Sequence, residues 1–105
     1  MAEIPLTGQS WHLVVPESIF RSLHNHLFCG DGDEHGAVIA AGLSRTSDGR
    51  VRLLARNVHF AKDGVDYVPG TRGHRMLRAD FVQRRIRECR DQRLAYLAIH
   101  NHGGN

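Results

Sequence analysis

The expected fold and the expected site both start from one stretch near the end of the chain, Leu94-Ala95-Tyr96-Leu97-Ala98-Ile99-His100-Asn101-His102-Gly103-Gly104. Its first part carries no charge and predicts a buried central strand, because a strand covered on both faces needs no polar alternation. His100 and His102 follow two positions apart, and such residues of an extended chain point to the same face. We therefore expect the two imidazoles to meet at one point, as the ligands of a divalent transition metal do.

The same tripeptide occurs earlier in the chain, as His24-Asn25-His26, within a helical pattern. On a helix, residues at i and i+2 lie about 200° apart, so these two imidazoles diverge. We interpret the first pair as partly exposed helix residues and the second pair as metal ligands.

Length and composition indicate one soluble globular domain spanning residues 1–105, with 41% hydrophobic and 24% charged residues. No run approaches a membrane span, and the N-terminus lacks the pattern of a signal peptide, so we expect a cytoplasmic protein with no membrane partner. Cys29 and Cys89 are too few for a disulfide scaffold or a thiolate zinc cage. We expect both to be reduced, buried thiols.

The net charge of +3 hides a local excess, because eight of the thirteen arginines lie between Arg72 and Arg93. Such a run can contact nucleic acid or an acidic protein face. No aromatic residues interleave with the arginines as single-strand binding would require. We therefore favour the solvated side of a helix and do not expect a nucleic-acid partner.

Hydrophobic periodicity and turn residues divide the chain into alternating elements. The pattern predicts an α/β fold with a small mixed β-sheet flanked by helices. The expected order is a strand at 10–15, a helix from 16 to about 30, strands at 34–43 and 50–60 paired antiparallel through a turn at 47–49, a loop at 61–73, a helix from 74 to about 92, and the closing strand.

Side-chain parity gives further expectations within these elements. In the strand at 50–60 the apolar positions change parity near Asn57, which predicts an irregularity there. The strand at 34–43 is built of small residues that leave room for close packing. In the second long helix the expected buried residues are Leu77, Phe81, Val82, Ile86 and Cys89.

Glu34 begins a strand that otherwise avoids charge. It can be a solvated strand end, or it can serve a metal hydrolase, which needs a carboxylate beside its metal-bound water. Such a carboxylate takes a proton from the water and delivers it to the leaving amine. If the Glu34 strand lies near the strand that ends at His100, the carboxylate and the imidazoles meet at one end of the sheet.

Glu34-x-Gly36, a small apolar strand ending at Gly42, an amphipathic helix and a strand ending in His100-x-His102 together resemble the JAMM metalloprotease family. The resemblance covers most of the chain. It implies a JAB/MPN fold, which is cytidine-deaminase-like, and a zinc-dependent isopeptidase or peptidase acting on ubiquitin or a ubiquitin-like protein. By that likeness His100 and His102 ligate Zn²⁺ and Glu34 is the catalytic acid/base. The partners it implies are a ubiquitin-like or sulfur-carrier protein and an E1-like activating enzyme.

The chain departs from the family pattern in two places. Asn101 and Gly103 stand where family members commonly carry Ser or Thr and Pro, a spelling closer to the RadC-like branch. The family's third ligand, an aspartate, and its oxyanion-stabilising serine have no counterpart after Asn105. We therefore expect a domain incomplete at its C-terminus, with an unpaired apolar sheet edge, that does not turn over substrate unless another chain supplies the aspartate. The alternatives are a metal-free MPN-type interaction module and a RadC-like member with a nucleic-acid-related role.

Overall fold

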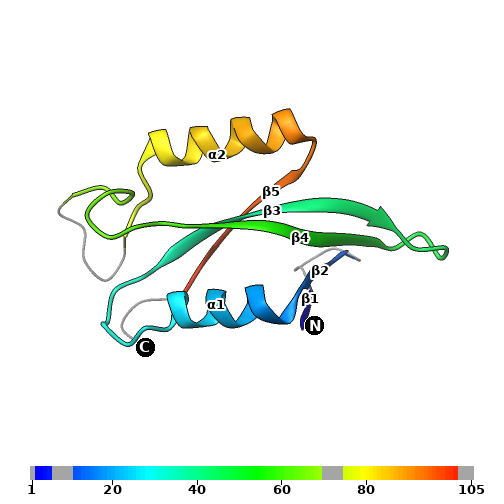
Figure 1. The fold of residues 1–105 in the computed structure, drawn as a ribbon, viewed down its shortest axis with the longest axis horizontal. Coiled ribbons are helices and arrows are strands. Elements are labelled where there is room, and N and C mark those ends of the chain that lie inside the picture. Colours follow the sequence, from blue (N-terminus) through cyan, green and yellow to red (C-terminus); the bar gives the residue numbers. More distant parts are fainter. Residues whose placement is uncertain (1, 6–10, 70–74, 102–105) are drawn as a thin grey trace.

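The computed structural model describes residues 2–5, 11–69 and 75–101 of the chain (Figure 1). None of the helices in these segments is long and apolar enough to cross a membrane. β1 is an addition to the predicted order, and the remaining order of strands and helices is confirmed. In chain order the elements are β1 (Ala2–Pro5), β2 (Trp11–Val15), α1 (Glu17–Leu27), β3 (Gly36–Arg45), β4 (Val51–Phe60), α2 (Ala79–Gln92) and β5 (Ala95–His100).

The strands form one five-stranded sheet in the order β1-β2-β4-β3-β5 over the described residues. β2 pairs with β4 in parallel, whereas β1 with β2, β3 with β4, and β3 with β5 are antiparallel. The predicted mixed sheet and the predicted antiparallel hairpin are therefore confirmed.

The two helices cover opposite faces of the sheet, α1 on one side and α2 on the other (Figure 1). Leu23 and Leu27 of α1 pack with Ile39 and Leu53 of the sheet in the larger apolar cluster. On the opposite face, Phe81 of α2 packs in a smaller cluster that also contains Val38, Ala61 and Tyr67. Successive β3 side chains alternate between the two clusters, because neighbouring residues of a strand point to opposite faces.

β3, and not β5, is the strand that is buried on both faces. Every residue from Gly36 to Gly42 is buried. β5 lies at the edge of the sheet, and its residues are half-buried or exposed. The prediction that residues 94–99 form a buried central strand is wrong in this respect. The uncharged side chains of β5 pack on both faces of the sheet, Leu97 and Ile99 on the α1 side and Tyr96 on the α2 side. The expected unpaired apolar edge is present among the described residues.

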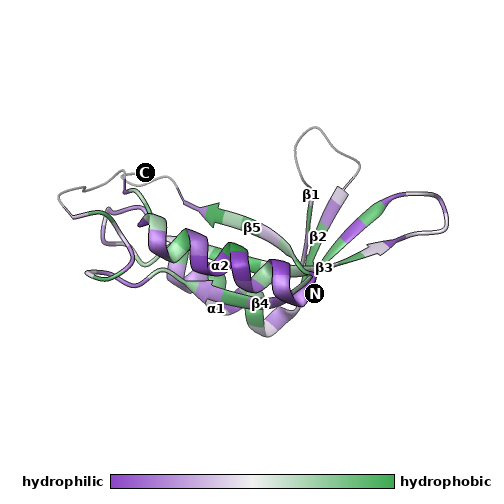
Figure 2. Cartoon of the chain, turned by 90° about the horizontal axis from the view of Figure 1, so that it is seen from above, coloured by the Kyte–Doolittle hydropathy of each residue, from purple (hydrophilic) through white to green (hydrophobic). Residues whose placement is uncertain are grey.

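α2 begins later than predicted, at Ala79, and the predicted start at His74 lies outside the described residues. Leu77 forms a β-bridge with Tyr67, so the residues just before α2 are held against the preceding loop. Phe81 and Cys89 are buried as predicted, but Ile86 is exposed. The prediction for Ile86 is wrong because the inward face of α2 is formed by Phe81, Val82 and Cys89, and Ile86 lies outside it. Figure 2 shows the helix as mostly hydrophilic, in keeping with its arginine-rich outer side.

Two further predictions concern the irregular strand and the cysteines. The β3–β4 register shifts between the pairs Ala40↔Asn57 and Ala41↔Ala55, which is the irregularity expected near Asn57. Cys89 is buried, but Cys29 is exposed, so the expectation of two buried thiols is wrong for Cys29. Cys29 lies beyond the end of α1, where the chain has left the apolar face of the helix.

Candidate functional site

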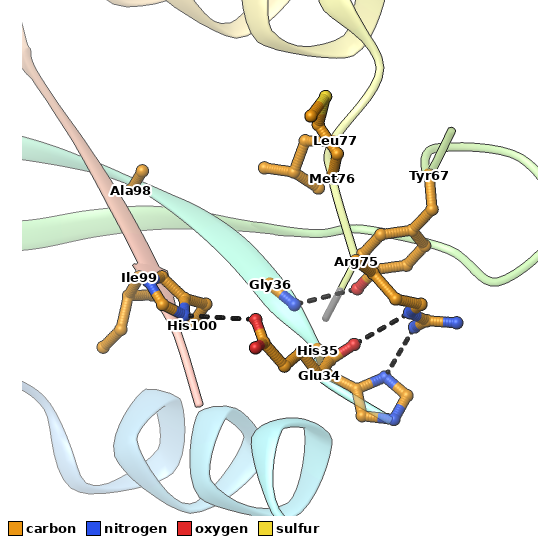
Figure 3. A pocket seen from close by; sticks show the side chains of 10 residues that line it. All are labelled: Glu34, His35, Gly36, Tyr67, Arg75, Met76, Leu77, Ala98, Ile99 and His100. Atoms are coloured by element: carbon orange, nitrogen blue, oxygen red, sulfur yellow. Dashed lines mark hydrogen bonds and ion pairs between the residues drawn. The ribbon is translucent and has the colours of Figure 1, made fainter. Parts of the chain in front are cut away.

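The structure brings Glu34 and His100 together at one end of the sheet. Gly36 pairs with His100 across the β3–β5 ladder, which places Glu34, two residues before β3's first position, beside the end of β5. His100 Nδ1 lies 3.7 Å from Glu34 Oε2 (Figure 3). Glu34 is buried, with 8% of its surface exposed, while the His100 side chain is largely exposed. The third predicted site residue, His102, lies outside the described residues.

A pocket of about 330 Å³ opens beside this pair. Figure 3 shows the end of β5 with His100 on one side of the pocket, Tyr67 and Arg75 on the other, and Met76 and Leu77 above. Such a cleft, apolar with a few convergent polar groups, is the usual form of a small binding or active site. The polar residues are Glu34, His35, Tyr67, Arg75 and His100, and the apolar residues are Met76, Leu77, Ala98 and Ile99.

Arg75 forms hydrogen bonds and a ring contact with several residues around this pocket. Its Nε donates to the Glu34 backbone oxygen at 2.8 Å, and its Nη2 donates to Asp63 Oδ1 at 2.6 Å and to His35 Nδ1 at 3.1 Å. The guanidinium also stacks 3.7 Å from the Tyr67 ring centroid. Only 9% of the Arg75 side chain is exposed. This arginine is thus a buried organising residue, an exception to the interpretation of the arginine run as a solvated face.

Asn101 ties the end of β5 to the start of β3. Its side-chain oxygen accepts a hydrogen bond from the His35 backbone N–H at 2.6 Å, and its own backbone N–H donates to the His35 oxygen at 3.2 Å. Nearby, the Tyr67 hydroxyl accepts from the buried Gly36 N–H at 2.8 Å. The asparagine between the two histidines therefore has a structural role that spacing alone did not reveal.

The hydrogen bonding of His100 fits that of a metal ligand. The carbonyl oxygen of Asn101 lies 3.2 Å from His100 Nδ1, and a carbonyl can only accept, so Nδ1 carries the proton. Metal-binding histidines commonly donate one ring N–H to a carbonyl or carboxylate and bind the ion through the other nitrogen. In this tautomer Nε2 would be the nitrogen that binds an ion, and Nδ1 faces the Glu34 carboxylate; Glu34 and His100 belong to no three-ligand group within the described residues.

A second group of reactive side chains lies in the turn between α1 and β3. His35 Nε2 is 3.0 Å from Cys29 Sγ and 2.9 Å from both carboxylate oxygens of Asp31. The hydrogen bond from His35, helped by one from the Asp33 backbone N–H, lowers the pKa of Asp31 to about 2. The sequence analysis did not single out these residues. The signal was their spacing, Cys-x-Asp-x-x-x-His, in a turn.

No protein-family model, curated protein or solved structure matches this chain. The proposals below therefore rest on the geometry of the described residues and on the resemblance of the site residues to the JAMM motif.

Proposed function

We propose that this chain is a zinc-dependent metallopeptidase domain of the JAMM type, with a JAB/MPN fold. It would hydrolyse an amide or isopeptide bond at the C-terminus of a ubiquitin-like or sulfur-carrier protein in the cytoplasm, with an E1-like activating enzyme as a further partner. The observation that carries the proposal is the approach of Glu34 to His100, 3.7 Å apart beside a pocket. These two residues are 66 positions apart in the chain and meet only through the β3–β5 pairing.

In this proposal each residue has one role. His100 and His102 hold the zinc ion, which when bound supplies a Lewis acid that polarises the substrate carbonyl and lowers the pKa of water. Glu34 accepts a proton from the attacking water and donates it to the departing amine. Burial of Glu34 at the base of the pocket holds its carboxylate close to His100 and away from bulk solvent.

The substrate would bind along the β5 edge. In the described part of the chain β5 pairs with β3 alone, so its outer edge can accept an extended peptide by strand addition. A substrate tail paired there would run toward His100 at the end of β5. Leu77 and Ala98 line the adjoining pocket and offer apolar contact to a side chain of that tail.

The first test measures Zn²⁺ binding by isothermal titration calorimetry, with Cys29→Ser in every variant so that the Cys29, Asp31 and His35 group does not contribute. His100→Ala should weaken binding at this site by at least tenfold, because it removes one of the proposed ligands. The matched control is His24→Ala, which alters the same His-Asn-His spelling on the exposed surface of α1 and should leave the affinity unchanged. Equal affinities in the two variants would refute the metal assignment.

The second test concerns Glu34. In a protein in which the third ligand is supplied, Glu34→Gln should keep zinc and lower the rate of hydrolysis of a ubiquitin-like protein fused through its C-terminus to a reporter by about 10²- to 10⁴-fold, the usual contribution of an acid/base group. Full activity in Glu34→Gln would show that another group transfers the proton.

A metal-free interaction module is the second candidate, and the apolar edge of β5 is the observation that favours it. Catalytic zinc usually has three protein ligands, and His100 belongs to no group of three possible metal ligands among the described residues. Absence of zinc uptake, together with binding of a ubiquitin-like protein that is lost when the β5 edge is altered by Ala98→Pro, would support this function instead.

A further inference from the structure

We propose that Cys29, Asp31 and His35 form a metal site for a zinc-like divalent ion, separate from the site of Glu34 and His100. The Cys29 sulfur, an Asp31 carboxylate oxygen and a His35 ring nitrogen all lie within 4.8 Å of one another. Thiolate, carboxylate and imidazole are the three ligand types that zinc takes in proteins, and three of them are the number that a site with one open position uses.

Local structure holds this group together. The chain leaves α1 and turns through Gly30 and Gly32, whose φ angles of 82° and 80° favour glycine, before it enters β3. This turn brings Cys29 and Asp31 to the His35 ring. The His35 side chain is 5% exposed, whereas Cys29 and Asp31 are exposed, so the site combines a fixed imidazole with two ligands that an ion can reach from solvent.

An adjoining pocket of about 380 Å³ gives the ion room for a further ligand. It is lined by Cys29 and His35 together with His26, Phe60, Lys62 and Asp63. The Glu34 carboxylate and His100 do not line it, since they face the other pocket. An ion bound here would therefore have its own open position, independent of the proposed catalytic site.

Charge favours a cation over a reactive thiol at this position. His35 Nδ1 accepts a hydrogen bond from Arg75, which cannot accept one, so Nε2 carries the proton in this structure. A histidine already protonated at Nε2 cannot take the proton of Cys29. A Cys29 thiolate beside the ionised Asp31 would leave two negative charges together, and a divalent ion neutralises both.

Asp63 is placed to accept a hydrogen bond from the metal-bound His35 ring. Binding through Nε2 would move the imidazole proton to Nδ1, so the hydrogen bond that Arg75 donates to Nδ1 would be given up, and Asp63 Oδ1, 3.9 Å from Nδ1, would become the acceptor. A carboxylate that accepts the second ring N–H of a metal-bound histidine is the common arrangement. The Cys29 thiol proton leaves to solvent, so one proton is released for each ion bound.

The test is titration of the full chain with Co²⁺, a spectroscopic substitute for zinc. We expect a near-ultraviolet thiolate-to-cobalt charge-transfer band that disappears in Cys29→Ser and is displaced by Zn²⁺. Cys89→Ala, which removes the other cysteine, and His100→Ala, which removes a ligand of the proposed catalytic site, should both keep the band. This readout depends on sulfur and therefore separates the present proposal from the proposed peptidase function.

A second variant tests this contact of Asp63 without touching a ligand. Asp63→Asn should weaken Co²⁺ binding by roughly 10- to 100-fold, the usual effect of removing such a partner. Circular dichroism checks that each variant remains folded. The proposal is overturned if the wild-type chain gives no charge-transfer band, or if the band survives Cys29→Ser.

Discussion

Replacement of Asn101 by alanine should destabilise the domain, because it leaves the buried backbone N–H of His35 without its hydrogen-bond acceptor. The Asn101 side chain accepts a 2.6 Å hydrogen bond from the backbone N–H of His35, a residue only 4% exposed. In Asn101→Ala that N–H loses its partner, and the buried donor carries the cost of its lost hydration. Among the described residues, Asn101 is the side chain that accepts from this N–H.

The magnitude follows from the burial of the two groups. Leaving a buried donor unsatisfied costs about 1–3 kcal/mol. Asn101 itself is half-buried, so water can partly replace its side chain, and we expect the lower part of that range, about 1–2 kcal/mol. With a urea m-value of about 1.5 kcal/mol per M, the midpoint of unfolding should fall by about 1 M.

The assay is urea unfolding followed by circular dichroism, with Asn25→Ala as the matched control. Asn25 stands between His24 and His26 as Asn101 stands between His100 and His102, but it is exposed on α1. Its replacement should change stability by no more than about 0.7 kcal/mol, the scale of helix propensity. If the two alanine variants unfold at the same urea concentration, the hydrogen bond between the Asn101 side chain and the His35 N–H is not a determinant of stability.

Two further predictions concern contacts between α2 and the sheet. Burial lowers the pKa of His59 on β4, and the positive charge of Arg85 lowers it further, while Glu88 has a smaller opposing effect. The folded state therefore favours neutral His59. The stability that neutral His59 contributes is complete above the unfolded pKa of about 6.5 and is lost as the pH falls through the lower folded pKa. Over this pH range the urea midpoint should therefore decline less in His59→Gln than in the wild type. Phe81→Ala should cost about 3–5 kcal/mol because Phe81 is buried against the sheet, whereas Ile86→Gln, at a residue 45% exposed, should stay within about 0.5 kcal/mol in the same assay. A large loss in Ile86→Gln would mean that the Ile86 side chain packs against the sheet.

The element order could be read from the sequence because it depends on local signals. Apolar spacing on α1, the turn before β4 and the parity change near Asn57 are properties of short segments, and each appears in the structure where the sequence placed it. β1 was missed because four residues with a terminal proline carry no periodic pattern, and its strand conformation depends on pairing with β2.

The candidate site was only partly accessible in this way. Glu34 and His100 could be named because their residue types stand out against uncharged strands. Arg75 could not, since one arginine in a basic run looks like its neighbours until Asp63, Tyr67 and the Glu34 carbonyl surround it.

The sequence by itself determined where most strands and both helices lie and which few side chains are candidates for chemistry, since periodicity and residue type are local properties. The tertiary structure alone decided the rest. Strand order made β3 the buried strand and β5 the edge, because an uncharged run does not specify its neighbours. The rotation of α2 decided that Ile86 faces solvent. Pairing across the sheet brought Glu34 to His100, and the turn after α1 brought Cys29 to His35, because such contacts form only when distant segments fold together.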